Sequence, residues 1–196
     1  MMTTYRWATA ARTTFAAAAL ALGTFAAMAQ DAADRLTIEL KDGPVVIELR
    51  SDLAPQHVER LRTLTESGAY DGVAFHRVID GFMAQTGDVE FGKEGADMRR
   101  AGTGGSDLPD LPAEFTTEAK FERGTVGMAR AQDPNSANSQ FFIMFEPAPF
   151  LDGQYTIVGE VVEGMENVDK IKRGDGPNGT VVGEPDRMLD VSVGEG

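Results

Sequence analysis

The chain has 196 residues, of which 18 are Lys or Arg and 31 are Asp or Glu, so its net charge at neutral pH is −13. This acidic balance argues against electrostatic binding to nucleic acid or to anionic lipid. Because the chain contains no Cys, its fold cannot rely on disulfides, and both thiol catalysis and N-terminal lipidation at a cysteine are excluded.

The N-terminal segment predicts a cleavable signal peptide. Arg6 and Arg12 are the only charges before Asp31, and they precede an apolar run, Thr13 to Ala27, that is about as long as a signal-peptide core. The alternative is an uncleaved membrane anchor. The run is built from weakly apolar alanines and no basic flank follows it, which favours the signal peptide.

Small residues at Ala27-Met28-Ala29 place the cleavage site between Ala29 and Gln30. Residues 1–29 would then be removed, and residues 30–196 would form one domain with a single core. The mature chain would carry 16 basic and 31 acidic residues, a net charge of −15. We expect a periplasmic protein that is exported through this N-terminal signal peptide.

The domain is expected to open with a β-hairpin and a helix. Alternating apolar and polar residues predict strands over Leu36 to Leu40 and Val45 to Leu49. A helix is predicted from Asp52, with Pro55 in its first turn and Gly68 as its stop. His57 on this helix is interpreted as a surface residue without a role.

The rest of the chain consists mostly of short extended runs, which predict a mainly β fold of the sandwich or closed-barrel type. A second helix is expected over Met165 to Lys172. The predicted strands cover Val73 to Ile79, Phe82 to Thr86, Thr125 to Ala129, Phe141 to Phe145, Tyr155 to Val162 and Met188 to Val193.

Between these strands, Val89 to Thr117 is rich in Gly, Asp, Glu and Pro and lacks periodicity, which indicates long irregular loops. Two interpretations remain open for its first part, Val89 to Ala101. It is a solvated loop, or it is a lid or selectivity element beside a functional site.

Conventional hydrolytic or metal chemistry has little support. His57 and His76 are the only imidazole bases. No pair of His at ligand spacing and no calcium-loop pattern of carboxylates is present. An acidic hydrolase with paired carboxylates has no spacing to support it, so we expect neither a metal nor a cofactor.

One long motif and four shorter ones resemble the cyclophilins. The run FHRVIDGFMAQTGD, Phe75 to Asp88, is similar to the central motif of that family. The shorter motifs follow in the family's order and are Gly102–Gly105, Gly127–Ala131, Asn138–Ile143 and Phe150–Gly153. The resemblance covers roughly Leu36 to Val193. It implies a closed eight-stranded antiparallel cyclophilin-like barrel capped by two helices, with peptidyl-prolyl cis-trans isomerase activity.

The resemblance also implies a division of roles among the site residues. Arg77 would be the catalytic residue, donating to the prolyl nitrogen as the amide twists. Strand alternation, not the resemblance, predicts that the neighbouring His76 points inward and braces the fold. Phe82, Met83, Phe142 and Leu151 would line the proline pocket, although plain core packing is the alternative for these apolar side chains. The remaining substrate-binding residues would be Gln85, Ala129, Arg130, Ala131, Gln140, Phe150 and Tyr155.

This chain departs from many family members at three of these positions. Phe150 stands where they carry Trp, whose indole donor is associated with tight cyclosporin A binding, so we expect weak binding of that drug. Tyr155 stands at or near a position where eukaryotic relatives have His. Arg130 replaces an Asn, but the expected contact comes from the main chain.

The expected partners are proline-containing unfolded or partly folded polypeptides, with no nucleic acid and no membrane after signal cleavage, and we expect a monomer. The leading hypothesis is an isomerase that speeds the folding of exported proteins. The alternative is a proline-peptide-binding chaperone or assembly module in which catalysis is incidental.

Overall fold

A computed structural model describes Met1 and residues 35–194 of the chain. Apart from Met1, the predicted signal segment and its cleavage site lie outside the described residues. All the elements below belong to one unit of the chain, Ala32–Gly196. None of the helices in the described ranges has both the length and the apolar character that crossing a bilayer requires.

The domain is a single antiparallel sheet of eight strands, which confirms the mainly β prediction. Its order in space is β3-β4-β6-β5-β7-β2-β1-β8. In chain order the strands are β1 (Arg35–Leu40), β2 (Gly43–Leu49), β3 (Arg77–Ile79), β4 (Met83–Thr86), β5 (Thr125–Met128), β6 (Phe141–Met144), β7 (Ile157–Glu163) and β8 (Asp190–Val193).

The sheet curls into an open half-barrel, so the expectation of a closed barrel was wrong. The edge strands β3 and β8 do not pair with each other in the described residues. Instead, irregular segments beside them meet: Phe75 donates to the Asp186 carbonyl over 2.8 Å and Met188 to the Val73 carbonyl over 3.0 Å. These bonds satisfy main-chain groups at the opening without completing a strand ladder.

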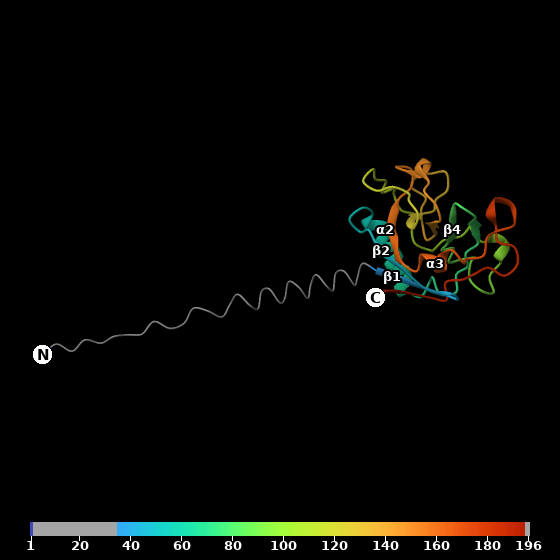
Figure 1. Ribbon diagram of the computed structural model, residues 1–196, viewed down its shortest axis with the longest axis horizontal. Helices are drawn as coiled ribbons and strands as arrows, with labels where there is room; N and C mark the ends of the chain where they lie inside the picture. The colour runs from blue at the N-terminus through green and yellow to red at the C-terminus, as the bar shows by residue number, and fades with distance from the viewer. Residues whose placement is uncertain (2–34, 195–196) are drawn as a thin grey trace. The chain divides into compact units, whose positions relative to one another are not determined.

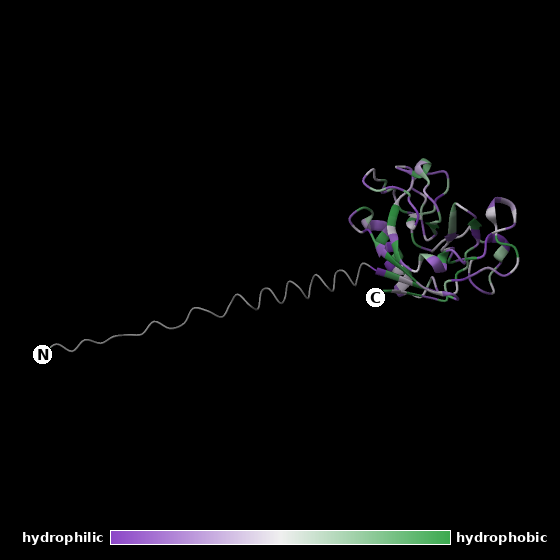
Figure 2. Ribbon diagram, viewed as in Figure 1, coloured by the Kyte–Doolittle hydropathy of each residue, from purple (hydrophilic) through white to green (hydrophobic). Residues whose placement is uncertain are grey.

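The opening hairpin shows how the sequence pattern builds the core. Leu36, Ile38 and Leu40 alternate along β1 and are buried, because successive side chains of a strand point to opposite faces. The chain turns back at Gly43, whose φ of +127° favours glycine. Figure 2 shows hydrophobic residues concentrated along the strands and more polar residues in the loops.

Helix α2 (Pro55–Glu66; Figure 1) packs against this core, and β8 is the strand that lies next to it. Val58, Leu61 and Leu64 are buried at the helical spacing predicted for them. Ala54 at the N-cap offers no side-chain acceptor. Glu114, 60 residues along the chain, takes that place.

The Glu114 carboxylate accepts hydrogen bonds from the main-chain N–H groups of Gln56 and His57, both over 3.1 Å. It therefore caps the helix from the long loop. The interpretation of His57 as a surface residue was wrong, because its side chain is 0% exposed and its Nδ1 lies 2.6 Å from Glu114 Oε2.

Two other elements are shorter than predicted. Only Arg77–Ile79 of the Val73 to Ile79 run is a strand, since its first half bonds across the sheet opening instead. The second helix, α3 (Met165–Val168), ends before Lys172. Beyond its end the chain continues in turns with hydrogen bonds between residues three apart, such as that from the Ile171 N–H to the Val168 carbonyl over 3.1 Å.

The region from Val89 to Thr117 is irregular, as predicted, apart from the short helix η1 (Met98–Arg100). Two further single turns occur later in the chain, η2 (Pro149–Leu151) and η3 (Pro177–Gly179). Both adjoin the residues that are discussed next.

Candidate active site

Two adjoining cavities lie over the strands β4, β5 and β6. One, the apolar cavity, has a volume of about 410 Å³ and is lined by Arg77, Phe82, Met83, Gln85, Ala129, Arg130, Phe142, Phe150, Leu151 and Tyr155. The other, the polar cavity, has a volume of about 420 Å³ and shares Gln85, Ala129 and Arg130 with the first. Ten of the predicted site residues therefore meet at one cavity.

Gln140 and Ala131 line the polar cavity instead. His76 lines neither cavity. It lies behind the polar cavity's wall, where a Cβ on Gly102 would come within 3.0 Å of its ring.

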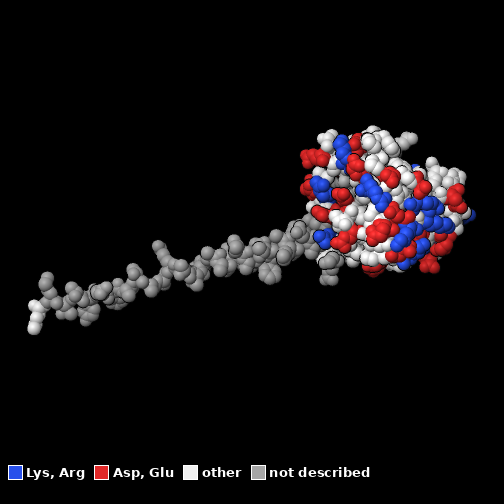
Figure 3. All heavy atoms as spheres, viewed as in Figure 1, with Lys and Arg blue, Asp and Glu red and all other residues white. Residues whose placement is uncertain are grey.

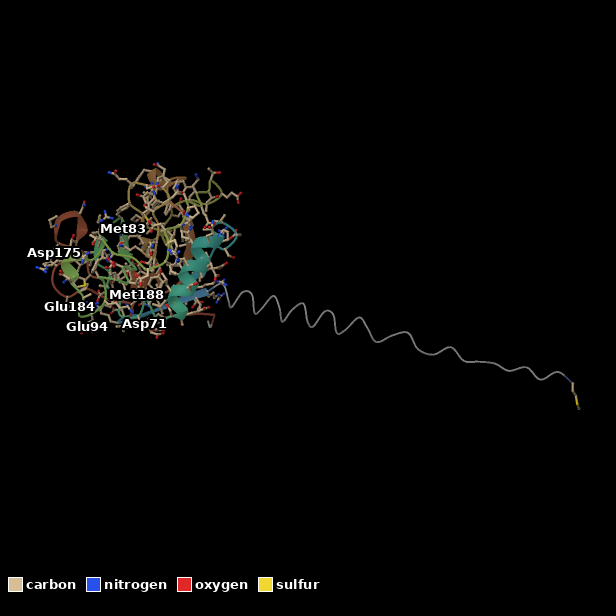
Figure 4. The ribbon with its side chains drawn as sticks, turned by 180° about the vertical axis from the view of Figure 1, so that it is seen from behind. Asp71, Met83, Glu94, Asp175, Glu184 and Met188 are labelled. Carbon is tan, nitrogen blue, oxygen red and sulfur yellow. The ribbon has the colours of Figure 1, made fainter. Side chains whose placement is uncertain are left out.

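The floor of the apolar cavity is also part of the core. Met83, Phe142 and Leu151 are 2%, 5% and 8% exposed and belong to a second buried cluster with Phe121 and Met144. In Figure 4 the side chain of Met83 lies inside the domain. The two interpretations of these apolar residues are therefore compatible, since one surface of each packs in the core and another faces the cavity.

The rim of the apolar cavity is aromatic. Phe150 is 65% exposed and its ring lies 5.7 Å from that of Phe82, centroid to centroid. On the other side, Tyr155 meets Phe142 edge to face at 5.9 Å. A small apolar ring would be surrounded by these side chains.

Arg77 is placed by the pairing of β3 with β4, which sets it opposite Gln85. Its Nε donates to the main-chain carbonyl of Asn178 over 3.0 Å, and its Nη1 donates to Gln85 Oε1 over 3.1 Å. Within residues 35–194, no hydrogen bond uses its Nη2. Burial lowers the pKa of Arg77 below its ordinary value, against the effect of nearby Tyr155, but a guanidinium stays charged at neutral pH.

The amides of Gln85 and Gln140 form a directional chain behind Arg77. Gln85 Nε2 donates to Gln140 Oε1 over 2.9 Å, and Gln140 Nε2 donates to the Gly104 carbonyl over 2.8 Å. Because a carbonyl only accepts, Gly104 fixes which end of the Gln140 amide faces Gln85, and so which end of Gln85 faces Arg77. The guanidinium is held between two main-chain carbonyls, directly at Asn178 and indirectly at Gly104.

The loop that carries Gly104 is organised by Asp88, whose side chain is 0% exposed. Asp88 Oδ2 accepts from the N–H groups of Gly102 and Gly104 over 2.7 and 2.9 Å, and Oδ1 accepts from Phe91 over 2.8 Å. Arg100 makes a cation–π contact with this loop's Phe91, with its guanidinium 3.7 Å from the centre of the ring. Both ends of the Val89 to Ala101 loop are thus tied to one buried carboxylate.

The polar cavity contains residues for which no role was predicted. Its wall includes Thr103, Ser106, Asp110, Ser136 and Asn138. Two parts of this wall belong to motifs that resemble the family, Gly102–Gly105 and Asn138–Ile143. Their residue types did not indicate that they line one cavity.

Arg130 separates the two cavities. Its guanidinium lies 4.5 Å from the centre of the Tyr155 ring, and it donates to the carbonyls of Gln154 and Ala131 over 3.0 and 2.9 Å. The Ala131 N–H is also engaged, because it donates to Ser136 Oγ over 2.9 Å. Among the described residues, the N–H of Arg130 itself has no hydrogen bond within the chain.

His76 is buried, with 5% of its surface exposed. Burial lowers its pKa below the ordinary histidine value, while the carboxylate of Asp88 acts in the opposite direction. Within residues 35–194, no three His, Asp or Glu side chains lie together as metal ligands. The chemistry available at the cavities is that of two guanidiniums, several side-chain amides and an apolar pocket.

The family model for "cyclophilin type peptidyl-prolyl cis-trans isomerase/CLD" matches residues 35–193. A probable peptidyl-prolyl cis-trans isomerase of Brucella suis is 58% identical over 91% of this chain and 93% of its own length. A Helicobacter pylori peptidyl-prolyl cis-trans isomerase is 38% identical over 71% of this chain and 80% of its own length.

Solved structures agree. A cyclophilin from Hirschia baltica superimposes with a TM-score of 0.68 at 26% identity, over 83% of this chain and 74% of its own. A Cryptosporidium parvum cyclophilin type isomerase, crystallised in the presence of the dipeptide Ala-Pro, gives 0.69 at 27% identity, over 81% of this chain and 98% of its own. This chain belongs to the cyclophilin-type peptidyl-prolyl cis-trans isomerases.

Proposed function

We propose that Arg77 catalyses rotation of the Xaa-Pro bond of a peptide whose proline ring occupies the apolar cavity. One observation carries this proposal. Arg77 reaches the wall of an apolar cavity with two donors fixed inside the protein and Nη2 left for a ligand. A guanidinium held in this way can donate to the prolyl nitrogen without first reorganising.

A donor at this nitrogen lowers the barrier for an electronic reason. The bond resists rotation by about 18–20 kcal/mol because the nitrogen lone pair is conjugated with the carbonyl. A hydrogen bond to the nitrogen localises the lone pair and is strongest when the amide is twisted, so it favours the transition state over both planar forms. A thousand-fold to million-fold acceleration requires roughly 4–8 kcal/mol.

The polar cavity would hold the residues before the proline. The Arg130 N–H lies between the two cavities without a partner in the described chain, and the Gln140 amide lies beside it in the wall. An extended peptide that bonds to this main chain would place its next side chain in the polar cavity. Gln85 would align the peptide while it also orients Arg77.

The clients we propose are exported proteins whose slow prolyl bonds delay folding outside the cytoplasm. The pattern of residues 1–29, which resembles a signal peptide, supports a periplasmic location. Fractionation of cells that express the full chain tests this location. Recovery in the cytoplasm with Met1 retained would contradict it.

An Arg77→Ala variant tests the catalytic proposal, with Arg99→Ala as the control because the Arg99 side chain is 90% exposed and pairs only with Asp97. Turnover of a Xaa-Pro peptide should fall at least tenfold in the first variant, by the loss of one charge-assisted bond, and stay unchanged in the control. Peptide affinity should change much less. If turnover persists in Arg77→Ala while binding is retained, the chain acts as a proline-peptide binder in which Arg77 has no catalytic part.

A further inference from the structure

The segment from Gly174 to Val181 lies along the open edge of strand β3. Gly174 donates to the Val78 carbonyl over 2.8 Å, and Val181 donates to the His76 carbonyl over 3.0 Å. Thr180 forms an isolated bridge with Arg77 itself. In Figure 1 this red segment lies beside the green strands, and in Figure 4 Asp175 marks it at the edge of the domain.

The fit between this segment and the strand leaves no room for adjustment. A Cβ on Gly179 would lie 2.3 Å from Ile79 Cγ1, and one on Gly174 would lie 1.9 Å from the Gly179 carbonyl. Such distances are impossible for real side chains, so both positions require glycine. The turn between them therefore packs closely on itself and on β3.

Asn178 at the centre of this turn has a left-handed backbone conformation, with φ 62° and ψ 20°. Among the described residues it is the only one other than glycine with a positive φ. Asn tolerates this region better than most residues, whereas a β-branched side chain is strained there. Its carbonyl is the group that accepts the hydrogen bond from Arg77 Nε over 3.0 Å.

We infer that Asn178 is a positioning residue for the isomerase reaction: its left-handed turn holds a carbonyl against Arg77 Nε and so directs the guanidinium into the apolar cavity. The inference rests on the proposed catalytic role of Arg77. The Asn178 side-chain amide makes no hydrogen bond in residues 35–194. Its backbone conformation, not its amide, is what the site uses.

The hydrogen bond from Arg77 Nε to the Asn178 carbonyl limits how the guanidinium can move. Without the Nε bond, the guanidinium would be fixed only by Gln85 Oε1 at Nη1 and could rotate about that contact. A donor that is free to rotate stabilises the transition state little better than water does, because this kind of catalysis depends on a donor that is already oriented. Binding of the proline ring by the apolar side chains would be little affected.

The test compares Asn178→Val with Asn178→Gly in the full chain. Valine is strained at a φ of 62° and should displace the carbonyl, whereas glycine keeps the turn and removes only the unused amide. The matched control is Gly183→Val, because Gly183 has a φ of +77° and an added Cβ would contact only Lys172 Nζ at 3.7 Å. It introduces similar strain nearby without touching Arg77.

We expect Asn178→Val to lower kcat for a Xaa-Pro peptide about tenfold with KM changed less than about twofold. Asn178→Gly should retain most of the turnover, and Gly183→Val should lose stability but not turnover. In NMR spectra, the Nε–H resonance of Arg77 should move in Asn178→Val and stay in place in the other two. A shift of equal size in Gly183→Val, or an equal loss of kcat in Asn178→Gly, would overturn the inference.

An Arg77→Ala background separates this inference from the proposed function. If Asn178 acts through Arg77, then Asn178→Val should cause no further loss of turnover in that background. A further loss of about tenfold would refute the inference even if Arg77 is catalytic. If Arg77→Ala alone has full turnover, the proposed catalytic role of Arg77 is wrong. The Arg77 resonance in the proteins that retain Arg77 still reports whether Asn178 holds the side chain.

Discussion

Arg77 owes its orientation to two acceptors on different segments of the chain. Asn178 precedes β8, and Gln85 lies on β4, so the guanidinium is fixed only when both segments are in place. Gln85 is in turn fixed by Gln140 and the Gly104 carbonyl. The guanidinium is thus one member of a chain of directional hydrogen bonds that runs from the Asn178 carbonyl to the Gly104 carbonyl.

Replacing Gln140 by Met tests this chain. Methionine has a similar length but neither donates to the Gly104 carbonyl nor accepts from Gln85, so the Gln85 amide becomes free to rotate. We expect kcat/KM for a Xaa-Pro peptide to fall roughly threefold to tenfold, from one lost hydrogen bond. Gln132→Met, at an exposed position, is the control, and an equal effect of the two variants would contradict the account.

A second prediction concerns Phe150 and the binding of cyclosporin A. Its ring is 65% exposed at the rim of the apolar cavity and carries no hydrogen-bond donor. Phe150→Trp adds an indole N–H donor at this rim, so we expect cyclosporin A to bind at least about tenfold more tightly to this variant than to the wild type. Titration of both proteins with the drug measures this, and an unchanged affinity would show that the rim residue does not set it.

Among the elements, the long loops pack against the domain and hold parts of the site in place. The packing of Val89 to Ala101 is not that of a simple solvated loop, and its role as a lid or selectivity element beside the site stays a prediction. Phe91 is buried, and Lys93 donates to the Gly68 carbonyl over 3.2 Å. The loop packs on the domain and holds Gly104 in place through Asp88.

Gly104→Ala tests this support. An added Cβ would lie 2.6 Å from Asp88 Oδ1 and 2.7 Å from the Phe91 ring, so the Gly104 carbonyl must move away from Gln140. We expect a loss of turnover of about threefold to tenfold together with a stability loss of about 1–3 kcal/mol. Gly95→Ala in the same loop is the control, because its φ of +82° makes alanine strained there while the added Cβ meets open space. It should leave turnover intact, and a drop as large as that in Gly104→Ala would count against this role of the loop.

The second support joins helix α2 to the loop that carries Glu114, and it is sensitive to pH. Burial lowers the pKa of His57, helped by the charge of Arg60 and opposed by the hydrogen bond to Glu114. Burial raises the pKa of Glu114, but hydrogen bonds from His57 and from the N–H groups of Gln56 and His57 lower it by more. Folding therefore favours the deprotonated form of both groups.

The sign of the pH dependence follows. An unfolded histidine takes up a proton below a pH of about 6.5, whereas folded His57 does so only at lower pH, so stability should fall as the pH drops through that value. The slope is at most about 1.4 kcal/mol per pH unit for each such histidine, and buried His76 has the same sign. Glu114 adds a loss below a pH of about 4.5.

Urea denaturation between pH 8 and 5 measures this slope, and His57→Gln should reduce it because glutamine can still donate to Glu114 without titrating. His76 would account for the slope that remains. If the wild type were as stable at pH 5 as at pH 8, His57 would not be held in its neutral form.

At the scale of the whole molecule, the sheet is the scaffold and one face of it carries both cavities. Acidic and basic side chains lie among one another on the surface that Figure 3 shows. Ion pairs such as Arg123–Asp169, at 2.6 Å, form between exposed side chains. The net charge of the full chain is −13. A neutral or locally basic peptide suits such a surface better than an acidic one.

Much of this arrangement could be predicted from the sequence. The alternation in Leu36–Leu40 indicates a half-buried strand, and Val58, Leu61 and Leu64 indicate the buried face of α2, because these patterns are local. Four of the ten residues around the apolar cavity lie in the one long motif, and all the others except Tyr155 lie in the shorter motifs. A motif of that length places side chains that the residue types alone would assign to the core.

What could not be predicted depends on contacts between distant segments. His57 pairs with Glu114, which is 57 positions away, and Arg77 with Asn178, which is 101 positions away. Neither partner can be identified from residue types. The open half-barrel likewise depends on the segment before β8, whose bonds to Phe75 and Val73 replace direct pairing of the edge strands.

The most direct test of the central claim is the rate of cis-trans exchange of a Xaa-Pro peptide while it is bound to the protein. NMR exchange spectroscopy measures this rate at saturating protein, so that binding and catalysis are separated. The account predicts that wild-type protein exchanges the bound peptide at least a thousand-fold faster than the free peptide and that Arg77→Ala loses at least tenfold of this rate at equal occupancy. An unchanged exchange rate in Arg77→Ala would contradict it.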